Sequence, residues 1–203
     1  MNKIIFDAKE ITPSKIVCVG RNYVEHIKEL NNELPSEPVI FIKPNSSIAD
    51  EIYFCPEDKV HFEGEICFLV QQGQLSGVGF GFDLTKRDVQ TRLKAKGLPW
   101  ERAKAFTGSA VFSRFVPYVG ELSSLRMVLT MNHNVVQRGG YAHMIYKPKI
   151  ILDDIKRFLT LEDGDIIMTG TPKGVAAIHR GAVFDAEIYT ADKLLISQRW
   201  TVN

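Results

Sequence analysis

The chain has 203 residues, of which 45% are hydrophobic and 24% are charged, a composition typical of a globular protein with one sizeable core. Its formal net charge of +1 gives no electrostatic reason to expect binding to nucleic acid or to an anionic membrane. It has no long apolar run and no secretory pattern, and its three cysteines lack a CxxC spacing. We therefore expect a reduced, cytoplasmic protein that forms a single domain over residues 1–203.

The first part of the chain alternates short apolar runs with breaks. Residues 15–20 (KIVCVG) and 39–43 (VIFIK) each predict a buried strand. Between them, apolar side chains recur at i, i+4 and i+7 over residues 22–30, which predicts one or two helical turns. Two prolines within residues 34–38 end that helix.

The middle of the chain predicts two neighbouring strands followed by a helix. Residues 61–70 (HFEGEICFLV) and 79–84 (GFGFDL) form the two strands, which a hairpin can join. Residues 85–96 predict the helix, because Thr85 can cap its start and Gly97 can end it.

The last part of the chain adds mostly strands. Residues 104–115 predict strand and loop, and Pro148 begins a helix over residues 148–159. Further strands are predicted at residues 126–133, 165–169, 183–190 and 194–202. Because strands outnumber helices and no regular βαβ alternation is present, we expect an α+β fold built around a mixed, rolled or barrel-like sheet.

Two carboxylates stand one residue apart at the head of the strand 61–70. Glu63 and Glu65 project from the same face of an extended strand, with their Cα atoms about 6.6 Å apart. At an effective dielectric near 20 such charges repel by about 2–3 kcal/mol. Water on an exposed face, a basic partner or a metal ion would offset this repulsion.

A third acid favours the metal. Asp83 ends the next predicted strand, so a hairpin can bring it beside Glu63 and Glu65. Glycines in residues 79–83 would let a ligand approach the backbone closely. Three oxygen donors without cysteine favour Mg²⁺, Mn²⁺ or Ca²⁺ over zinc.

At this point the sequence resembles the fumarylacetoacetate hydrolase family, from residue 15 to about residue 187. The resemblance is carried by five segments in order, GRNYVEHIKEL (20–30), HFEGEI (61–66), GFDLTKRDVQ (81–90), KGLPWERAKAFTGSA (96–110) and MTGTPKGV (168–175). The sequence is most similar to the short, single-domain branch with acylpyruvases and oxaloacetate decarboxylases. The resemblance implies a mixed β-roll, a homodimer, and Mg²⁺ or Mn²⁺ held by Glu63, Glu65 and Asp83.

His26 and Glu29 are neighbours on a helical turn because they are spaced i, i+3. A carboxylate beside an imidazole can orient it as a general base, although an exposed polar face would show the same spacing. The resemblance implies that this pair belongs to a mobile lid, residues 20–35, whose closure completes the site.

Other polar residues have an ordinary surface interpretation from spacing alone. The resemblance implies that Lys104 points into the pocket, where its charge would stabilise an enolate. It also implies that Arg87 and Gln90 bind the substrate carboxylate and that Thr171, in a turn-rich loop, contacts the bound acid. Arg21 is a further candidate for the pocket.

The expected reaction is metal-dependent hydrolysis of a C–C bond in an acylpyruvate, a 2,4-diketo acid such as fumarylpyruvate. In this interpretation His26 activates water, and cleavage leaves a pyruvate enolate. Decarboxylation or tautomerisation of oxaloacetate or a related 2-oxo acid passes through the same enolate and stays open as an alternative. A non-catalytic domain that binds a metal or a ligand is the third possibility.

Overall fold

The structure is a computed structural model that describes residues 1–30, 33–191 and 193–203. The strands are β1 (Ile4–Phe6), β2 (Lys9–Ile11), β3 (Lys15–Gly20), β4 (Val39–Pro44), β5 (Ile48–Ala49), β6 (Val60–Phe62), β7 (Gly64–Gln71), β8 (Gln74–Asp83), β9 (Thr85–Lys86), β10 (Ala110–Phe112), β11 (Val116–Pro117), β12 (Leu125–Met131), β13 (Asn134–Gly140), β14 (Ile166–Met168), β15 (Ala176–Ala177), β16 (Val183–Thr190) and β17 (Lys193–Thr201). The α-helices are α1 (Val24–Glu29), α2 (Arg87–Ala95), α3 (Glu101–Lys104) and α4 (Pro148–Ile155). Short 3₁₀ turns cover Asn45–Ser47, Leu122–Ser124 and Tyr141–His143.

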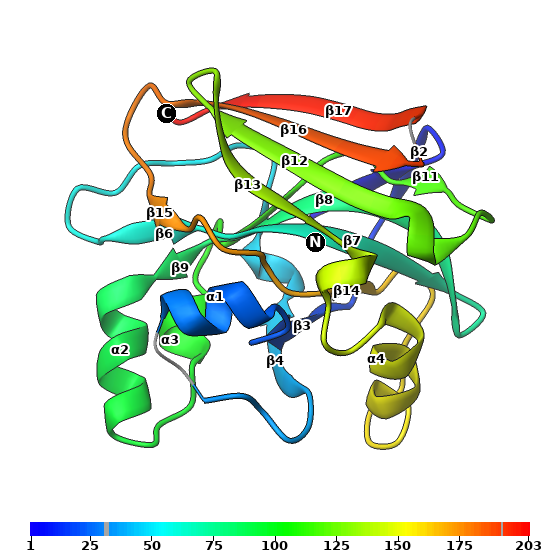
Figure 1. Cartoon of the computed structure of the whole chain (residues 1–203), viewed down its shortest axis with the longest axis horizontal. Coiled ribbons are helices and arrows are strands. Elements are labelled where there is room, and N and C mark those ends of the chain that lie inside the picture. Colours follow the sequence, from blue (N-terminus) through cyan, green and yellow to red (C-terminus); the bar gives the residue numbers. More distant parts are fainter. Residues whose placement is uncertain (31–32, 192) are drawn as a thin grey trace.

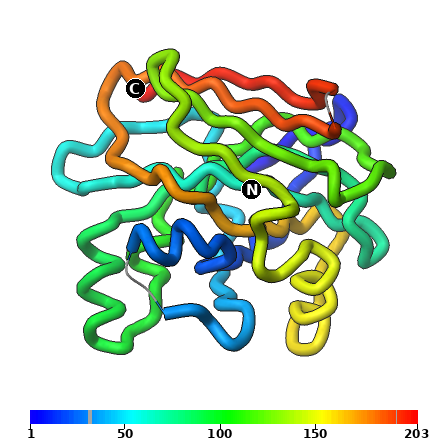
Figure 2. The backbone as a smooth tube through the Cα atoms, in the orientation of Figure 1, coloured from blue at the N-terminus to red at the C-terminus, as the bar shows by residue number. Residues whose placement is uncertain are grey.

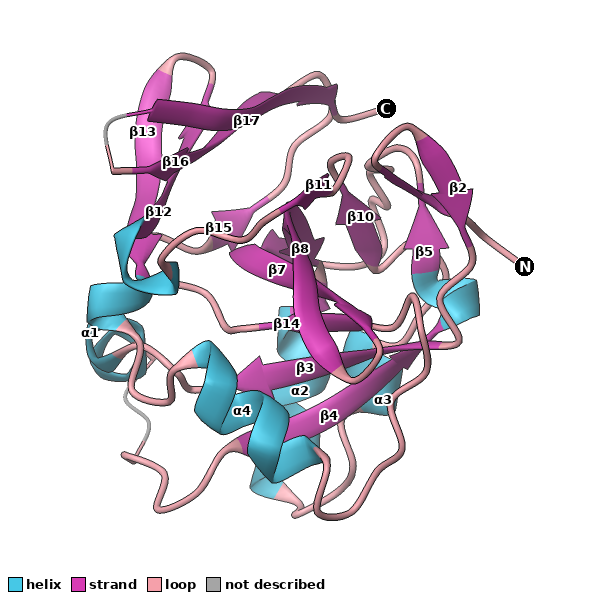
Figure 3. Cartoon of the chain, turned by 90° about the vertical axis from the view of Figure 1, so that its right-hand side faces the viewer, coloured by secondary structure: helices cyan, strands magenta, loops and turns pink. Residues whose placement is uncertain are grey.

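The largest sheet is mixed and curled like half a barrel (Figure 3). Its strands follow the order β4-β3-β14-β7-β8-β10-β5, with β11 added beside β8. β14 runs parallel to β3 and antiparallel to β7, which pairs antiparallel with β8 in a tight hairpin. The predicted α+β fold with a rolled sheet is therefore confirmed.

A second sheet covers one face of the first. It has the order β13-β12-β16-β17 and lies at the top of Figure 1, whereas the helices lie on the other side of the large sheet. Aromatic side chains fill the space between the two sheets: the ring centroids of Phe62 and Phe184 are 5.0 Å apart, and those of Phe82 and Trp200 are 5.2 Å apart. This core fixes the β7–β8 hairpin from one side.

The helices complete the other side. α4 packs Ile151 and Ile155 against Val17 of β3 and Ile167 of β14, within one apolar cluster. The segment containing α1, blue in Figure 2, lies beside the green segment of α2. α1 and α2 thus line the same pocket next to the hairpin.

Most predicted elements are confirmed, with differences in detail. The predicted strand 61–70 is interrupted at Glu63, and its pairing with β8 shifts register between Leu69 and Val70. Val70 therefore packs against α4, whereas Ile66 and Phe68 belong to the core between the two sheets.

Two further predictions about this region are wrong. Thr85 does not cap α2, because it belongs to β9 and Lys86 is the residue that precedes the helix. The glycines of β8 do not open the backbone to a ligand. A Cβ on Gly79 would lie 2.7 Å from the Phe115 ring, and one on Gly81 would lie 2.6 Å from Cys67 Sγ, so these glycines make room for packed side chains.

The structure also contains elements that were not predicted, among them β1, β2, β5, β11, β13, β15 and the short α3 that carries Lys104. Over the described ranges 1–30, 33–191 and 193–203, no helix is long and apolar enough to span a membrane.

Candidate active site

Three carboxylates converge at one end of the β7–β8 hairpin. Glu63 stands between β6 and β7, Glu65 lies in β7, and Asp83 ends β8. One oxygen from each of the three lies within 4.8 Å of the others, and the residues are 5%, 2% and 1% exposed. The Asp83 N–H donates to the Glu63 carbonyl at 2.9 Å, so backbone pairing itself holds the two acids together.

Buried cations balance these acids. Lys104 Nζ donates to Glu63 Oε2 at 2.9 Å and to Asp83 Oδ2, and it also donates to the Thr85 hydroxyl at 2.7 Å. Arg87 donates to the other oxygen of Glu63 and, at 2.7 Å, to Gln90 Oε1. The predicted contact of Lys104 with the acidic cluster is therefore present, and Arg87 and Gln90 share one helix face as expected.

The titration properties of Glu63 follow from these contacts. Burial raises the pKa of Glu63, but Lys104, Arg87 and His26 lower it by more, so its pKa falls well below the ordinary value. Burial lowers the pKa of Lys104, but Asp83 and Glu63 outweigh that effect and raise it. Both groups are therefore charged at neutral pH.

Glu65 is the least compensated of the three acids. Burial and the charges of Asp83 and Glu63 raise the pKa of Glu65 well above its ordinary value, against one hydrogen bond from Gly170 N–H at 2.6 Å. Gly170 has a φ of +96°, a conformation that favours glycine, and this turn directs its N–H toward the carboxylate. An additional positive charge would stabilise the ionised form of Glu65.

The donor set fits a hard divalent cation. All three residues offer carboxylate oxygens, and no cysteine or histidine belongs to the cluster among the described residues. Such oxygen-only sets are the ligands of Mg²⁺, Mn²⁺ or Ca²⁺ rather than zinc. The arrangement can therefore hold a metal ion, as the spacing of the acids predicts.

Lys43 is a buried cation that the sequence interpretation missed. Its side chain is 0% exposed, and Nζ lies 2.9 Å from Asp83 Oδ1. Nζ also donates to the carbonyl oxygens of Lys104 and, at 3.0 Å, Ser109. Lys43 thus ties the carboxylate of Asp83 to the segment that carries Lys104. The only local signal was a lysine at the end of an otherwise apolar strand.

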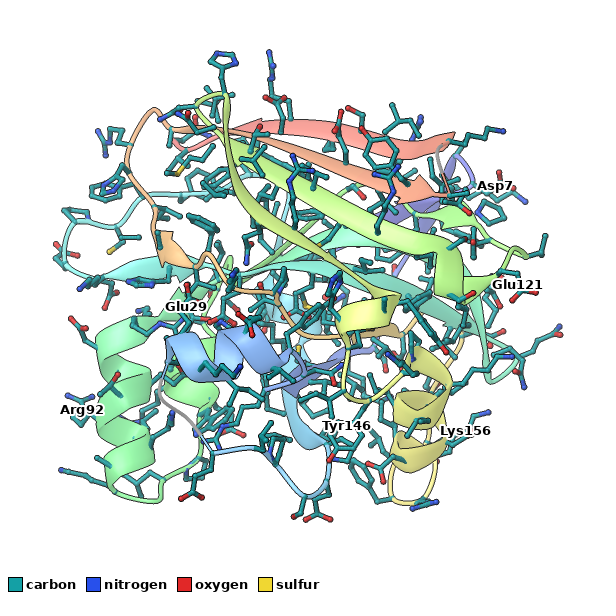
Figure 4. All side chains as sticks on the ribbon, in the orientation of Figure 1. Asp7, Glu29, Arg92, Glu121, Tyr146 and Lys156 are labelled. Atoms are coloured by element: carbon teal, nitrogen blue, oxygen red, sulfur yellow. The ribbon has the colours of Figure 1, made fainter. Side chains whose placement is uncertain are left out.

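His26 and Glu29 contact each other on α1. His26 Nδ1 lies 3.0 Å from Glu29 Oε2, while Glu29 Oε1 accepts a hydrogen bond from Gly174 N–H at 2.9 Å. Figure 4 shows Glu29 at the end of α1 beside the chain that follows β14. Glu29 therefore joins the imidazole to the loop 169–174.

Thr171 belongs to a buried network that also includes Gln137, another residue that was not predicted. Thr171 donates to the Gly64 carbonyl at 2.9 Å and accepts from Gln137 Nε2 at 2.8 Å. Gln137 Oε1 in turn accepts from Gly64 N–H at 2.9 Å. The network fixes the backbone between Glu63 and Glu65.

His61 lies on β6, two residues before Glu63. Both of its ring nitrogens are buried without a hydrogen-bond partner in the part of the chain that the structure describes. Burial, followed by the charges of Arg87 and Lys59, lowers the pKa of His61 to about 4. The imidazole is therefore neutral at physiological pH.

A small pocket connects these groups. It is lined by His26, Glu63, Arg87, Gln90 and Lys104 from the predicted set, together with Gly20, Arg21, Leu30, Phe41, Lys94 and Trp100. Its cavity volume is about 30 Å³, far below that of an ordinary small-molecule site.

Comparison with known proteins identifies the family. The family model described as fumarylacetoacetate (FAA) hydrolase C-terminal matches residues 15–199. The chain belongs to the fumarylacetoacetate hydrolase family. The resemblance inferred from the five sequence segments is confirmed.

Relatives within the fumarylacetoacetate hydrolase family have more than one activity. Oxaloacetate tautomerase YcgM from Escherichia coli (strain K12) is 38% identical over 186 residues, which span 83% of this chain and 85% of that protein. A crystal structure from Oleispira antarctica, of a protein with a proposed fumarylacetoacetate isomerase/hydrolase activity, has a TM-score of 0.91 at 37% identity and covers 100% of both chains.

Fumarylpyruvate hydrolase from Pseudomonas aeruginosa, whose crystal structure contains Mn²⁺ and pyruvate, has a TM-score of 0.88 at 26% identity. That match covers 100% of this chain and 96% of the other. The relatives therefore indicate an enzyme of this family, and the more similar one favours the tautomerase alternative over C–C hydrolysis.

Proposed function

We propose that the protein interconverts the keto and enol forms of oxaloacetate or a closely related 2-oxo diacid. The observation that carries this proposal is the 38% identity to oxaloacetate tautomerase YcgM across most of both chains. The site is consistent with it, because the His26 imidazole, the buried Lys104 and Glu63 line one pocket, and Glu65 and Asp83 lie next to Glu63.

We propose that Glu63, Glu65 and Asp83 hold Mg²⁺ or Mn²⁺. When bound, the divalent cation supplies a Lewis acid that polarises the 2-oxo group of the substrate. The Mn²⁺ in the fumarylpyruvate hydrolase structure supports a metal of this kind. The preference for a substrate with a carboxylate beside a carbonyl follows from the positive charges of Lys104 and Arg87 at the pocket wall.

His26 is the proposed general base. In the neutral imidazole with its proton on Nδ1, the Nδ1–H donates a hydrogen bond to Glu29 Oε2, and Nε2 has a free lone pair. In the keto-to-enol direction Nε2 takes a proton from C3, the C–H electron pair forms the C2=C3 double bond, and charge moves to the 2-oxo oxygen. That oxygen then takes up a proton from solvent and the imidazolium of His26 releases one to solvent, so the enol contains the same atoms as the ketone and the base is neutral again. Lys104 stabilises the charge on the oxygen as it grows.

The remaining predicted residues have proposed roles in binding. Arg87 and Gln90 face the carboxylate of the substrate, and Thr171 supports the loop that borders it. Residues 20–35 are the proposed lid, of which residues 31 and 32 lie outside the described residues. The small volume of the pocket is consistent with a lid that opens for entry.

Hydrolysis of an acylpyruvate remains the second candidate. It is favoured by the His26–Glu29 contact, which can also orient a base for water, and by the likeness to fumarylpyruvate hydrolase. The homodimer and the cytoplasmic location remain predictions.

The decisive experiment follows the ultraviolet absorbance of enol-oxaloacetate as it converts to the ketone, in parallel with a panel of oxaloacetate, acylpyruvates and fumarylpyruvate for cleavage. We expect the purified protein to accelerate tautomerisation with Mg²⁺ or Mn²⁺ and to lose this activity in a chelator. His26→Ala should lower kcat by about 10²–10⁴. Cleavage of an acylpyruvate without tautomerisation would favour the hydrolase. Tight metal binding without turnover of any substrate would favour a non-catalytic domain.

A further inference from the structure

Strands β3 and β14 end side by side, close to the acidic cluster (Figure 3). They run parallel, with Met168 of β14 paired to Cys18 of β3, so the segments that follow the two strands start at the same edge of the sheet. After β3 the chain enters α1, which carries His26, and after β14 it forms the turn at Gly170 that contacts Glu65. The proposed general base and one proposed metal ligand therefore depend on neighbouring segments.

Asn22 joins these two segments. It is 0% exposed and lies between β3 and α1. Its Nδ2 donates to the Thr169 carbonyl at 2.8 Å and to the Tyr146 carbonyl at 2.9 Å, and its Oδ1 accepts from the Tyr146 N–H at 2.7 Å. The Asn22 amide therefore connects the start of α1 to backbone that lies 124 and 147 positions away along the chain.

The turn after β14 packs directly against Asn22. A Cβ placed on Gly170 would lie 2.8 Å from the Asn22 Cβ, so the turn and the start of α1 are in close contact. In this position the Gly170 N–H donates to Glu65 Oε2 at 2.6 Å. The Thr169 hydroxyl donates to the Ile66 carbonyl at 2.7 Å. Asn22 therefore contacts the same two residues that fix Glu65 and its neighbour in β7.

The two ends of α1 are attached to the loop 169–174 in different ways. At the far end, Glu29 Oε1 accepts from the Gly174 N–H at 2.9 Å, and the Glu29 side chain is 31% exposed. At the near end Asn22 is fully buried, and its backbone carbonyl accepts from the Ile145 N–H at 2.8 Å. Because exposed hydrogen bonds open more readily than buried ones, a movement of α1 should release Glu29 and keep Asn22 attached.

We propose that Asn22 is a positioning residue for the reaction centre: its amide holds the Gly170 turn against Glu65 and anchors the start of α1, one helical turn before His26. The inference rests on the proposed metal site and goes beyond it. Asn22 is not one of the described residues that line the pocket, so it acts through the turn and through α1 rather than on the substrate.

Asn45 provides a matched control. It is 8% exposed, and its side chain also makes three hydrogen bonds to the backbone. Nδ2 donates to the carbonyl oxygens of Asn2 and Pro13, and Oδ1 accepts from the Asn2 N–H, each at 2.8 Å. Asn45 follows β4 and lies near the start of β3, because these strands run antiparallel, whereas Asn22 follows the end of β3. Asn22→Ala and Asn45→Ala therefore remove the same groups at opposite ends of one strand.

The test measures Mn²⁺ affinity by electron paramagnetic resonance and tautomerisation at saturating Mn²⁺. Asn22→Ala should bind Mn²⁺ about tenfold more weakly than wild type, and its kcat should fall by about tenfold with a smaller change in KM. Asn45→Ala should stay within about twofold of wild type in all three quantities. Urea unfolding should show a similar loss of stability in both variants, since each loses three buried hydrogen bonds.

A further measurement needs no metal. In metal-free protein, the Gly170 amide hydrogen should exchange at least about tenfold faster in Asn22→Ala than in wild type or Asn45→Ala, because the turn is no longer held. If the alanine variants do not fold, Asn22→Ser and Asn45→Ser form a milder pair, since a hydroxyl can keep one of the hydrogen bonds.

The outcomes separate this inference from the proposed function. Equal Mn²⁺ affinity in Asn22→Ala and Asn45→Ala would overturn the inference and leave the proposed function intact, and so would equal exchange of the Gly170 amide. If wild-type protein binds no Mn²⁺, the proposed metal site fails, and the inference fails with it. If wild-type protein binds Mn²⁺ without tautomerising oxaloacetate, the proposed function fails, and the Mn²⁺ affinities still decide the inference.

Discussion

Two buried acids, Asp165 and Glu65, lie near opposite ends of β14 in different surroundings. Just before the strand, Asp165 accepts hydrogen bonds at 2.6–3.1 Å from the backbone N–H groups of Ser14, Lys15 and Glu162, from the Ser14 hydroxyl and from the Lys15 ammonium. Just after it, the Gly170 N–H donates a single hydrogen bond to Glu65, whose carboxylate lies beside those of Glu63 and Asp83.

The difference separates a structural carboxylate from a functional one. Burial raises the pKa of Asp165, but its five donors lower it by more, and the net pKa is below the ordinary value. Glu65 has the opposite shift, because neighbouring negative charges oppose its ionisation. A carboxylate that its own chain saturates stabilises the fold, whereas a crowded group of them favours binding of a cation.

Neutralising Glu65 should have the largest effect on activity. Glu65→Gln keeps the acceptor for Gly170 but removes one of the three charges, so we expect tautomerisation to fall by at least about 10³-fold. The metal-free protein should be as stable as wild type or more stable, since a repelled charge is lost. Activity, Mn²⁺ binding by electron paramagnetic resonance, and urea unfolding measure the three effects.

Glu121→Gln is the control for that experiment, because Glu121 lies at the far side of the molecule (Figure 4). Unchanged Mn²⁺ affinity in Glu65→Gln would contradict the proposed metal site.

Neutralising Asp165 should reduce stability and leave metal binding unchanged, the opposite of what we expect for Glu65→Gln. Asp165→Asn loses the charge that five donors stabilise, and we expect the free energy of unfolding to fall by about 2–4 kcal/mol. Affinity for Mn²⁺ should stay within about twofold, because this acid lies at the other end of β14. Asp153→Asn, on the exposed side of α4, controls for loss of a negative charge. A variant as stable as wild type would show that the five hydrogen bonds contribute little.

The pH dependence of stability sharpens the same contrast. Since the folded-state pKa of Asp165 is lower than its ordinary value of 3.8, its contribution is fully present above that pH and is lost as pH falls through the folded-state pKa. The stability difference between wild type and Asp165→Asn should therefore be constant near pH 7 and shrink below about pH 4. Urea titrations at pH 7, 4 and 3 measure it, and a constant difference would argue against an ionic origin.

We expect the smallest effect on Mn²⁺ affinity from substitutions in two lysine–aspartate pairs, Lys43–Asp83 and Lys15–Asp165. Lys43→Met removes one of the two buried lysines that contact Asp83, so we expect Mn²⁺ affinity to fall by about tenfold because this ligand is less firmly positioned. Lys15→Met removes the equivalent cation from Asp165 and should reduce stability without altering Mn²⁺ affinity. Equal Mn²⁺ affinity in the two variants would show that Lys43 has a purely structural role. Lys43→Arg, which retains the charge, should recover part of the affinity.

What the sequence predicted depended on how far apart the partners lie along the chain. Glu63 and Glu65 are joined by strand alternation, and His26 and Glu29 by a helical turn, so local spacing was enough to pair them. Asp83 required only the assumption of a hairpin. The strand order around β14 joins distant segments, and no local pattern indicated it.

Residues that depend on distant partners were missed. Lys43 meets Ser109 across 66 positions, and Gln137 meets Gly64 across 73 positions. No local sequence pattern around Lys43 or Gln137 indicates that its side chain is buried and hydrogen-bonded next to the site. The wrong cap at Thr85 has the same cause, because its hydroxyl accepts a hydrogen bond from Lys104.

Glu29 has two tasks, and they depend on one position of α1. One of its oxygens fastens α1 to the backbone at Gly174, and the other aligns the imidazole of His26. A movement of the proposed lid, residues 20–35, away from the site would separate Glu29 from Gly174 and would also loosen the orientation of His26. Proton transfer would then be confined to the position of α1 in which His26 is 6% exposed and Glu29 contacts both His26 and Gly174.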